Sequence, residues 1–292
     1  MEDWLILAIT AIIMYGSSMA AQKLSLNTLS TATMIVFSLL IALPMFLIVL
    51  AALIINGDIW NIGLDYFIYG LLGATFGQAG YYTYVEAAKR GPISIVGSLT
   101  ATYPAMVAVV AIVFLGETIT PAQGFGVILV MVGIVTLSYS HGKSEDAKKA
   151  TSKAYYAICV VTALLWGLWA IFTKFALIGM SDFAFLAIYS FVVPPVTYAY
   201  YRLNRIRIRD VWPKWSKAVK IAIVSSIVGN LAFFVEIAAI DMGPAPIVFP
   251  LIASSPLVVV LLAFAFLKER LSKIEWGLVA LVLVGIILVS TV

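Results

Sequence analysis

The sequence predicts an all-α integral membrane protein with ten transmembrane helices in two inverted five-helix repeats. Three observations carry this prediction: an apolar composition, a series of apolar runs of helix length, and an internal repeat that relates the two halves of the chain. Apolar residues make up 63% of the 292 residues and charged residues only 11%, and the mean hydropathy is +1.08. Soluble domains are nearer ~45–50% apolar and ~25% charged. The composition therefore excludes an ordinary soluble domain.

The apolar runs are each close to the ~20 residues that an α-helix needs to cross a bilayer. Each run is expected to be helical, because a backbone exposed to lipid must satisfy its own hydrogen bonds. Turn residues such as Asn56-Gly57 and Gly243-Pro244 separate the runs. The expected helices cover residues 4–22, 31–55, 66–88, 93–115, 121–139, 154–178, 183–201, 218–240, 244–267 and 274–292.

The internal repeat is clearest between residues 91–121 and residues 243–273, which superpose without a gap at a shift of 152 positions. Each copy has a Gly-Pro turn, a long apolar run with a central proline and a glutamate at its far end. The matching pairs are Gly91 with Gly243, Pro92 with Pro244, Pro104 with Pro256 and Glu117 with Glu269. Because each repeat holds an odd number of helices, the two copies must lie in the membrane with opposite orientations.

The match extends into the other helices of each half. Tyr15-Gly16 and Lys23 match Trp166-Gly167 and Lys174 at a shift of 151 positions. A linker of low hydrophobicity, residues 141–153, lies almost at the midpoint of the chain. We therefore expect a first five-helix domain at residues 1–139, a polar linker at 140–153 and a second five-helix domain at 154–292.

With these motifs the chain resembles the ten-helix members of the drug/metabolite transporter superfamily, which contain two EamA-type domains. The resemblance covers nearly the whole chain and rests on Trp166-Gly167 with Lys174, on the Gly-Pro turns with their mid-helix prolines, and on the Gly-Glu-Thr and Lys-Glu-Arg ends. It implies a monomer-sized transporter that works by alternating access. It also implies a central cavity lined by the first, third, fourth, sixth, eighth and ninth helices, and small metabolites such as amino acids as substrates.

Basic residues lie almost entirely on one face of the predicted bundle. All of the 18 Lys and Arg residues except Lys174 fall in or beside the loops that follow odd-numbered helices. The positive-inside rule places this basic face in the cytoplasm and both termini outside it. The resemblance implies the opposite orientation, which is the more common one in the family. Following the charges, we predict a multi-pass protein of the cell membrane with both termini outside the cytoplasm.

The basic linker at residues 202–217 connects two predicted spans, so a nucleic-acid partner is not expected. We predict that residues 202–220 contact anionic lipid headgroups, with Trp212 and Trp215 at the interface. His141 is the only histidine in the sequence, which leaves no second imidazole for a metal site or a catalytic pair. We therefore expect neither a metal nor another cofactor.

Polar residues within the spans are the candidates for a substrate site, because each costs free energy in lipid unless it faces a partner or a cavity. Gln78 and Asn230 occupy equivalent positions near the middle of the third and eighth helices. We favour a shared polar lining for these amides. The alternative is hydrogen bonding between helices, which the neighbouring Gly77 and Gly229 would permit by close packing.

Hydroxyl and aromatic side chains surround the same depth. Any single hydroxyl has the alternative of bonding back to its own helix. Ser18, Tyr81 and Ser255 also lie at this depth, next to residues that we select. The predicted substrate-binding residues are Gln78, Asn230, Tyr82, Ser17, Trp166, Trp169, Ser98, Thr102, Tyr103 and Ser254.

Two ion pairs are predicted to close the ends of the pathway. Lys174 and Glu236 lie near the outer ends of the sixth and eighth helices, and Lys23 and Glu86 end the first and third helices at the inner face. The alternative for the outer pair is a structural anchor. The alternative for the inner pair is neutralisation of Glu86 by the adjacent Arg90 or by Lys89.

The predicted function is secondary transport of a small neutral or zwitterionic metabolite, an amino acid or a related compound, in the direction of export. An exporter of organic cations is less favoured, because the first helix has no acid where small four-helix relatives hold one. A membrane-embedded enzyme would need several His, Asp or Glu residues at membrane depth, but Glu236 alone is a clear acid within a span. We therefore predict a protein that is not an enzyme, with a channel as a further alternative.

Overall fold

The computed structural model describes residues 2–57, 62–91, 93–141, 153–207, 211–267 and 272–289. Within these ranges the chain is helical and contains no strand. Six helical segments in the described part are long and apolar enough to cross a membrane. The predicted all-α membrane fold is therefore confirmed.

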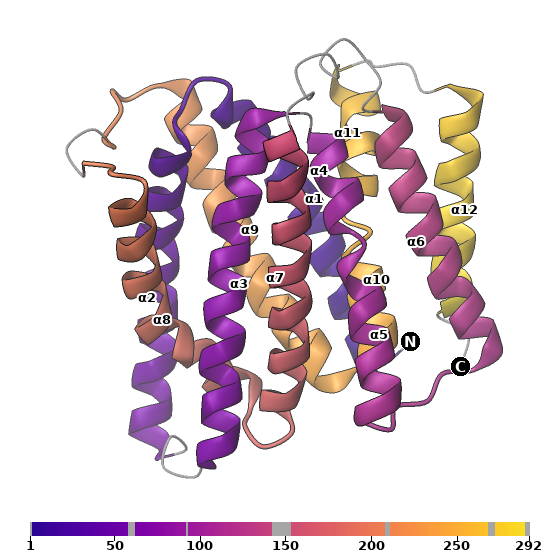
Figure 1. Cartoon of the computed structure of the whole chain (residues 1–292), viewed down its shortest axis with the longest axis horizontal. Coiled ribbons are helices and arrows are strands. Elements are labelled where there is room, and N and C mark those ends of the chain that lie inside the picture. Colours follow the sequence, from indigo (N-terminus) through magenta and orange to yellow (C-terminus); the bar gives the residue numbers. More distant parts are fainter. Residues whose placement is uncertain are drawn as a thin grey trace.

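The observed helices coincide with the predicted spans to within about one helical turn at each end. The N and C termini lie at the same end of the bundle, as an even number of crossings requires (Figure 1). The helices are α1 (Asp3–Leu26), α2 (Thr31–Asn56), α3 (Leu64–Arg90), α4 (Ile93–Thr100), α5 (Tyr103–Phe114), α6 (Pro121–His141), α7 (Lys153–Leu177), α8 (Asp182–Leu203), α9 (Lys217–Met242), α10 (Ala245–Ile252), α11 (Pro256–Leu267) and α12 (Lys273–Val289).

Two of the predicted continuous helices are each broken near the middle. The span predicted at 93–115 consists of α4 and α5, and the span predicted at 244–267 consists of α10 and α11. Pro104 lies in the first turn of α5, and Pro256 is the first residue of α11. Because proline has no backbone N–H and crowds the preceding turn, the helix ends before it and a new one begins. The matching prolines thus place two helix breaks inside the bundle.

Helices of one repeat pair mainly with helices of the other. The closest pairings are α1 with α9, α3 with α7, α2 with α8 and α6 with α12. The α2–α8 and α6–α12 pairs flank the bundle on opposite sides, and the remaining helices form its centre (Figure 1). This arrangement of two inverted five-helix repeats matches the prediction. It places the breaks in the α4–α5 and α10–α11 spans in the central group.

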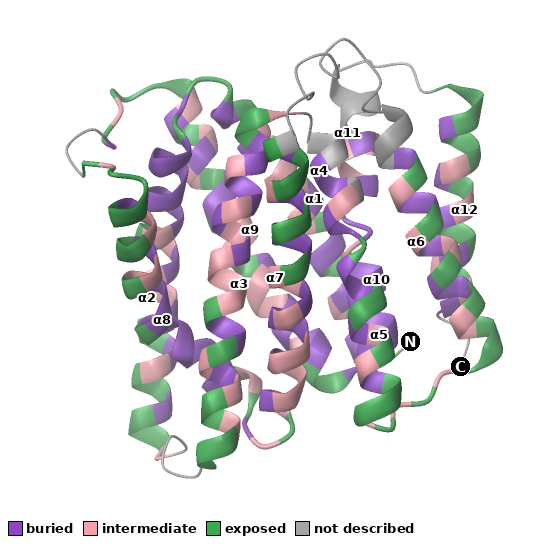
Figure 2. Ribbon diagram, viewed as in Figure 1, coloured by how far each residue is buried: buried purple, intermediate pink, exposed green. Residues whose placement is uncertain are grey.

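Glycines allow close approach of the paired helices. A Cβ added at Gly126 of α6 would lie 2.8 Å from the carbonyl oxygen of Gly285 in α12, and the reverse substitution gives the same distance. The outer faces of the bundle carry large apolar side chains such as Ile48 and Phe114, which are 70% and 72% exposed. Figure 2 shows buried residues where helices face one another and exposed residues on the outward faces. The exposed apolar surface is the one that lipid would cover.

Candidate functional site

A cavity of about 200 Å³ lies between the two repeats. Side chains of α1, α2 and α3 face side chains of α7, α8 and α9 across it, and the broken spans complete its wall. On α1 the lining residues run from Tyr15 in the middle of the helix to Gln22 near the end beside the basic loops. On α3 they run likewise from Gly77 to Tyr84. The cavity therefore extends from the centre of the bundle toward its basic face.

The two predicted amides both line this cavity. Gln78 and Asn230 approach it from α3 and α9, which are equivalent helices of the two repeats. The Nδ2 group of Asn230 donates to the carbonyl oxygen of Ser226 at 2.7 Å, one turn earlier in α9. A Cβ on the adjacent Gly229 would lie 2.7 Å from Ser18 Oγ, so close packing of α1 on α9 also occurs here. Both amides therefore lie on the cavity wall, and the described Asn230 bond stays within α9 rather than joining two helices.

Aromatic residues form much of the remaining wall. Trp166, Trp169 and Tyr103, all predicted as site residues, line the cavity. Trp166 stacks on Tyr84 with ring centroids 5.4 Å apart, and Tyr103 meets both tryptophans edge-on at 6.2 and 6.5 Å. Tyr189 joins this wall from α8. Flat aromatic surfaces therefore bound the cavity, beside the amides and hydroxyls that also line it.

Four predicted site residues lie outside the cavity, and their positions require a correction. Tyr82 is buried and shares a hydrogen bond with Thr197 of α8. Thr102 is exposed and donates to Leu99 O at 2.7 Å, while Ser254 is fully buried and donates to Leu251 O at 2.6 Å. Ser17 is partly buried and is also not part of the lining.

In each case a residue close in sequence lines the cavity instead. Ser18, Tyr81, Thr100 and Ser255 take these places. Successive helical residues point about 100° apart, so an error of one position moves a side chain from the cavity to a helix interface. The side chain of Ser98, which was also predicted, lies outside the described part of the structure.

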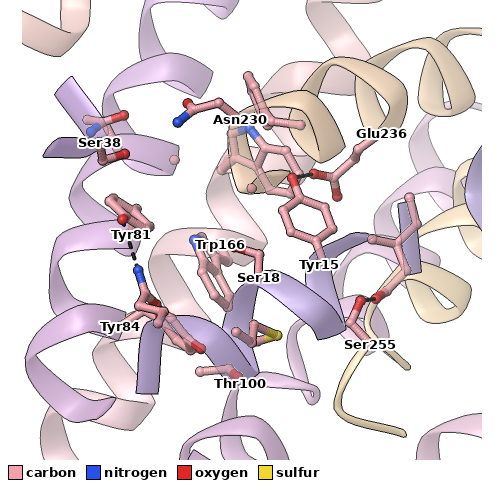
Figure 3. A pocket seen from close by; sticks show the side chains of 18 of the residues that line it. Tyr15, Ser18, Ser38, Tyr81, Tyr84, Thr100, Trp166, Asn230, Glu236 and Ser255 are labelled. Atoms are coloured by element: carbon pink, nitrogen blue, oxygen red, sulfur yellow. Dashed lines mark hydrogen bonds between the residues drawn. The ribbon is translucent and has the colours of Figure 1, made fainter. Parts of the chain in front are cut away.

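Glu236 lies in the cavity rather than at its outer gate, which corrects the predicted pairing with Lys174. Its carboxylate accepts a hydrogen bond from the Tyr15 hydroxyl, with Tyr15 Oη and Glu236 Oε2 2.5 Å apart. Glu236 is only 4% exposed. Figure 3 shows the Tyr15 and Glu236 side chains pointing toward each other within the wall of the cavity. Glu236 is therefore the acidic group of the candidate site.

Lys174 forms its ion pair with Glu117 instead. Lys174 Nζ lies 3.3 Å from Glu117 Oε1 and also donates to the carbonyl oxygens of Ile240 at 3.1 Å and Gly243 at 3.0 Å. Glu117 Oε2 accepts from the backbone N–H of Ala245 at 2.7 Å. The lysine thus caps the C-terminal end of α9, and Glu117 links the first repeat to the start of α10. We call this group the Lys174–Glu117 clamp.

The predicted inner pair is also replaced by other contacts. Lys23 Nζ donates to Ala88 O at 2.8 Å and to Gly91 O at 2.9 Å, at the end of α3. Glu86 pairs with Arg90 at 3.3 Å, which was the weighed alternative, and it also accepts a hydrogen bond from Tyr200. Lys23 therefore caps α3 as Lys174 caps α9, at equivalent carbonyl groups of the two repeats. Glu269, the counterpart of Glu117, lies outside the described residues.

Several cavity residues were not selected from the sequence, among them Gln22, Ser38, Tyr84 and Thr100. The repeat offered a signal for one of them, since Tyr84 occupies the position equivalent to Glu236. Nothing in the sequence distinguished Ser38 or Thr100 from hydroxyls that bond within their own helix. In the described part of the chain, no three His, Cys, Asp or Glu side chains lie close enough together to hold a metal ion.

Comparison with known proteins gives similarity in both sequence and fold. An uncharacterized protein of Methanocaldococcus jannaschii is 34% identical over 73 residues, which is 25% of this chain and 53% of that protein. The chain thus spans about half the length of the curated relative that it matches. A solved protein crystal structure superposes with a TM-score of 0.72 at 18% identity, covering 98% of this chain and 96% of the other. That likeness shows a shared fold.

The family comparison covers both repeats. The model of the EamA-like transporter family matches residues 3–139 and again residues 153–291. The two matched segments contain α1 to α6 and α7 to α12, and the cavity lies between them. With two family matches that together span nearly all of the sequence, the chain belongs to the EamA-like transporter family.

Proposed function

We propose that this membrane transporter moves a small neutral or zwitterionic metabolite, an amino acid or a related compound, out of the cell by alternating access. The observation that supports the proposal is the cavity between the repeats. It is lined by aromatic rings, by the amides of Gln78 and Asn230, and by one carboxylate, Glu236. A mostly apolar cavity with a few converging polar groups suits a small ligand of mixed character.

Alternating access is supported by the unequal ends of the cavity. It extends toward the basic face, while the opposite half of the bundle is filled by buried residues such as Leu5, Ala8 and Ile12 of α1. Inverted repeats can exchange their conformations, so that the closed half opens when the cavity half closes. Both repeats belong to one chain, so a monomer contains a complete pathway.

An organic cation is the second candidate substrate. The absence of an acid from the first helix counted against it, but α9 brings Glu236 to the cavity and supplies the missing charge. Cations also bind well to aromatic faces such as those of Trp166 and Trp169. Competition between amino acids and organic amines in one transport assay separates the two substrate classes.

Counterflow into proteoliposomes tests the transport function. Vesicles preloaded with an unlabelled compound should accumulate the labelled form of the same compound, with amino acids, nucleosides and organic amines tried in turn. Gln78→Ala and Asn230→Ala should each lower the initial rate about tenfold, because each removes a polar group from the cavity. Thr102→Ala is the matched control, since Thr102 lies outside the cavity and bonds to its own helix.

A result against the site would be normal counterflow in both amide variants together with a lower melting temperature, which is the pattern of packing residues. A saturable conversion of the compound, without exchange, would indicate an enzyme. A flux that neither saturates nor exchanges would indicate a channel.

The orientation in the membrane is part of the same proposal. The basic linker between α8 and α9 exposes Trp212 and Trp215, which are 57% and 70% exposed, as expected for side chains that reach lipid headgroups. With this face in the cytoplasm, both termini lie outside it. A green fluorescent protein fused to the C terminus should stay dark, while an alkaline phosphatase fusion should be active. The reverse pattern would show that the usual family orientation holds here.

A further inference from the structure

The two repeats build the cavity from equivalent positions that carry different chemistry. Tyr15 of α1 corresponds to Trp166 of α7, and Tyr84 of α3 corresponds to Glu236 of α9. The pseudo-twofold relation therefore converts the Tyr15–Glu236 contact into the Trp166–Tyr84 contact. The first is a hydrogen bond between a phenol and a carboxylate, and the second is a ring stack with centroids 5.4 Å apart.

These two pairs lie at different places in the cavity wall. In Figure 3 Tyr15 and Glu236 lie together on one side, and Tyr84 lies on the other, with Trp166 between them. All four residues line the cavity. The cavity is thus polarised, with a carboxylate on one side and a flat aromatic surface on the other. A symmetric fold has produced an asymmetric site.

Glu236 has no cationic partner among the described residues. The described ion pairs join Glu86 to Arg90 and Glu117 to Lys174. The hydrogen bond from the neutral Tyr15 hydroxyl satisfies one carboxylate oxygen. An ionised carboxylate out of water is costly without a positive partner, and acids inside membrane spans generally face a functional pathway. Glu236 therefore has the environment of a group whose partner is supplied from outside the chain.

Aromatic rings surround this carboxylate. Tyr84, Tyr189 and Trp169 all line the cavity, and their hydroxyl and Nε1 atoms are buried in its wall, so these side chains present mainly ring surface to a ligand. Tyr103 and Tyr189 add aromatic surface beside the carboxylate, and aromatic faces attract cations.

We propose that Glu236 is the subsite for an ammonium group of the substrate, and that Trp166 and Tyr84 hold its apolar part. The inference rests on the proposed function, because it takes the cavity as the substrate site. It narrows the substrate class to small compounds with a protonated amine next to an apolar or aromatic group. Zwitterionic aromatic amino acids and aromatic amines meet this description. Small carboxylates without an amine do not.

Binding to the purified full-length protein tests the subsite with two probes of nearly equal shape. Phenethylamine carries an ammonium group, and 2-phenylethanol has a hydroxyl in its place. Isothermal titration calorimetry should give phenethylamine a Kd lower by about tenfold or more, because a hydrogen bond to a charged group exceeds a neutral one by that much. In Glu236→Gln the ratio of the 2-phenylethanol Kd to the phenethylamine Kd should fall to near one. Affinity for 2-phenylethanol should change less than twofold.

Three further variants distinguish loss of the charge from loss of the fold and from loss of apolar contact. Glu86→Gln removes a carboxylate that lies outside the cavity and pairs with Arg90, so the ratio should stay at its wild-type value. Glu236→Asp retains the charge, so it should keep a preference for phenethylamine even where Glu236→Gln folds poorly. Trp166→Leu should weaken both probes by a similar factor, because it removes apolar contact and no charge.

An unchanged ratio of the two Kd values in Glu236→Gln would overturn the proposed ammonium subsite. Wild-type protein that binds 2-phenylethanol as tightly as phenethylamine, or that binds neither probe, would overturn it as well. The counterflow panel separates this failure from failure of the transport proposal. Exchange of neutral compounds, with full activity in Glu236→Gln, would leave a transporter without an ammonium subsite. No exchange of any compound would contradict the transport proposal itself.

Discussion

The two halves of the bundle, one beside the basic loops and one beside the termini, differ in how the same helices meet. In the basic half the cavity lies between the α1–α9 pair and the α3–α7 pair, and amides and hydroxyls face this space. In the other half α1 and α5 fill the centre with side chains such as Leu5, Ile12 and Val107. The structure is therefore closed at one end, and under the proposed alternating access the contacts of that half are the ones that would break.

The Lys174–Glu117 clamp is a polar contact that joins the two repeats in the closed half. The Lys174 and Glu117 side chains are 15% and 19% exposed, so the pair is shielded from water more than a surface ion pair is. It also bonds to two carbonyl groups of α9 and to the backbone N–H of Ala245. We propose that this clamp holds the outer end closed, in place of the Lys174–Glu236 pair expected from the sequence.

The largest expected effect is therefore on the closed half. Lys174→Glu places two carboxylates together beside the α9 carbonyl groups, and Glu117→Lys places two ammonium groups together. Each should lower counterflow about ten- to a hundredfold, since hydrogen bonds to charged groups contribute about 1.5–3 kcal/mol. The double variant should recover part of the loss, because the attraction returns while the backbone contacts of each side chain do not.

Arg90→Gln is the comparison on the cavity side of the bundle. Arg90 pairs with Glu86 within one helix, and its side chain is 51% exposed. An exposed pair of this kind contributes about 0.3–0.5 kcal/mol, so counterflow should stay within twofold of wild type.

The double variant Lys174→Glu, Glu117→Lys also gives the result that would contradict the clamp. If the losses of the two single variants simply multiply, the two residues act separately and the clamp would have to be abandoned.

The fold could be predicted from the sequence because its determinants are local and repeated. Span length and the Gly-Pro turns each depend on a few neighbouring residues. The shift of 151–152 positions shows the same local features a second time. The helix breaks were missed although their cause, the central prolines Pro104 and Pro256, was visible. Pro44 and Pro195 are accommodated within continuous helices, so the presence of a proline does not by itself decide between a kink and a break.

The site was harder to predict, because it depends on the rotation of each helix about its axis. Gln78 and Asn230 were found because the repeat marks them twice. Ser17 and Ser254 were chosen one position away from the lining residues Ser18 and Ser255. The partner of Lys174 depends on where the loop after α5 lies against α10, which no spacing within α7 or α9 reveals.

The adjacent tyrosines Tyr81 and Tyr82 allow the smallest and sharpest test of the cavity boundary. Tyr81 lines the cavity, and its hydroxyl accepts from Gln22 Nε2 at 3.0 Å. Tyr82 points away from the cavity and bonds to Thr197 of α8. Each Phe substitution removes one hydroxyl and leaves the ring, at a cost of about 1 kcal/mol.

For Tyr81→Phe that cost should appear mainly in transport, as a KM changed severalfold, because the hydroxyl belongs to the cavity wall. For Tyr82→Phe it should appear as a lower melting temperature with an unchanged KM, because the lost bond holds α3 to α8. Counterflow kinetics and thermal unfolding of the same two preparations measure both quantities. A KM effect confined to Tyr82→Phe would return Tyr82 to the substrate site, where the sequence first placed it, and would move the boundary of the cavity by one helical position.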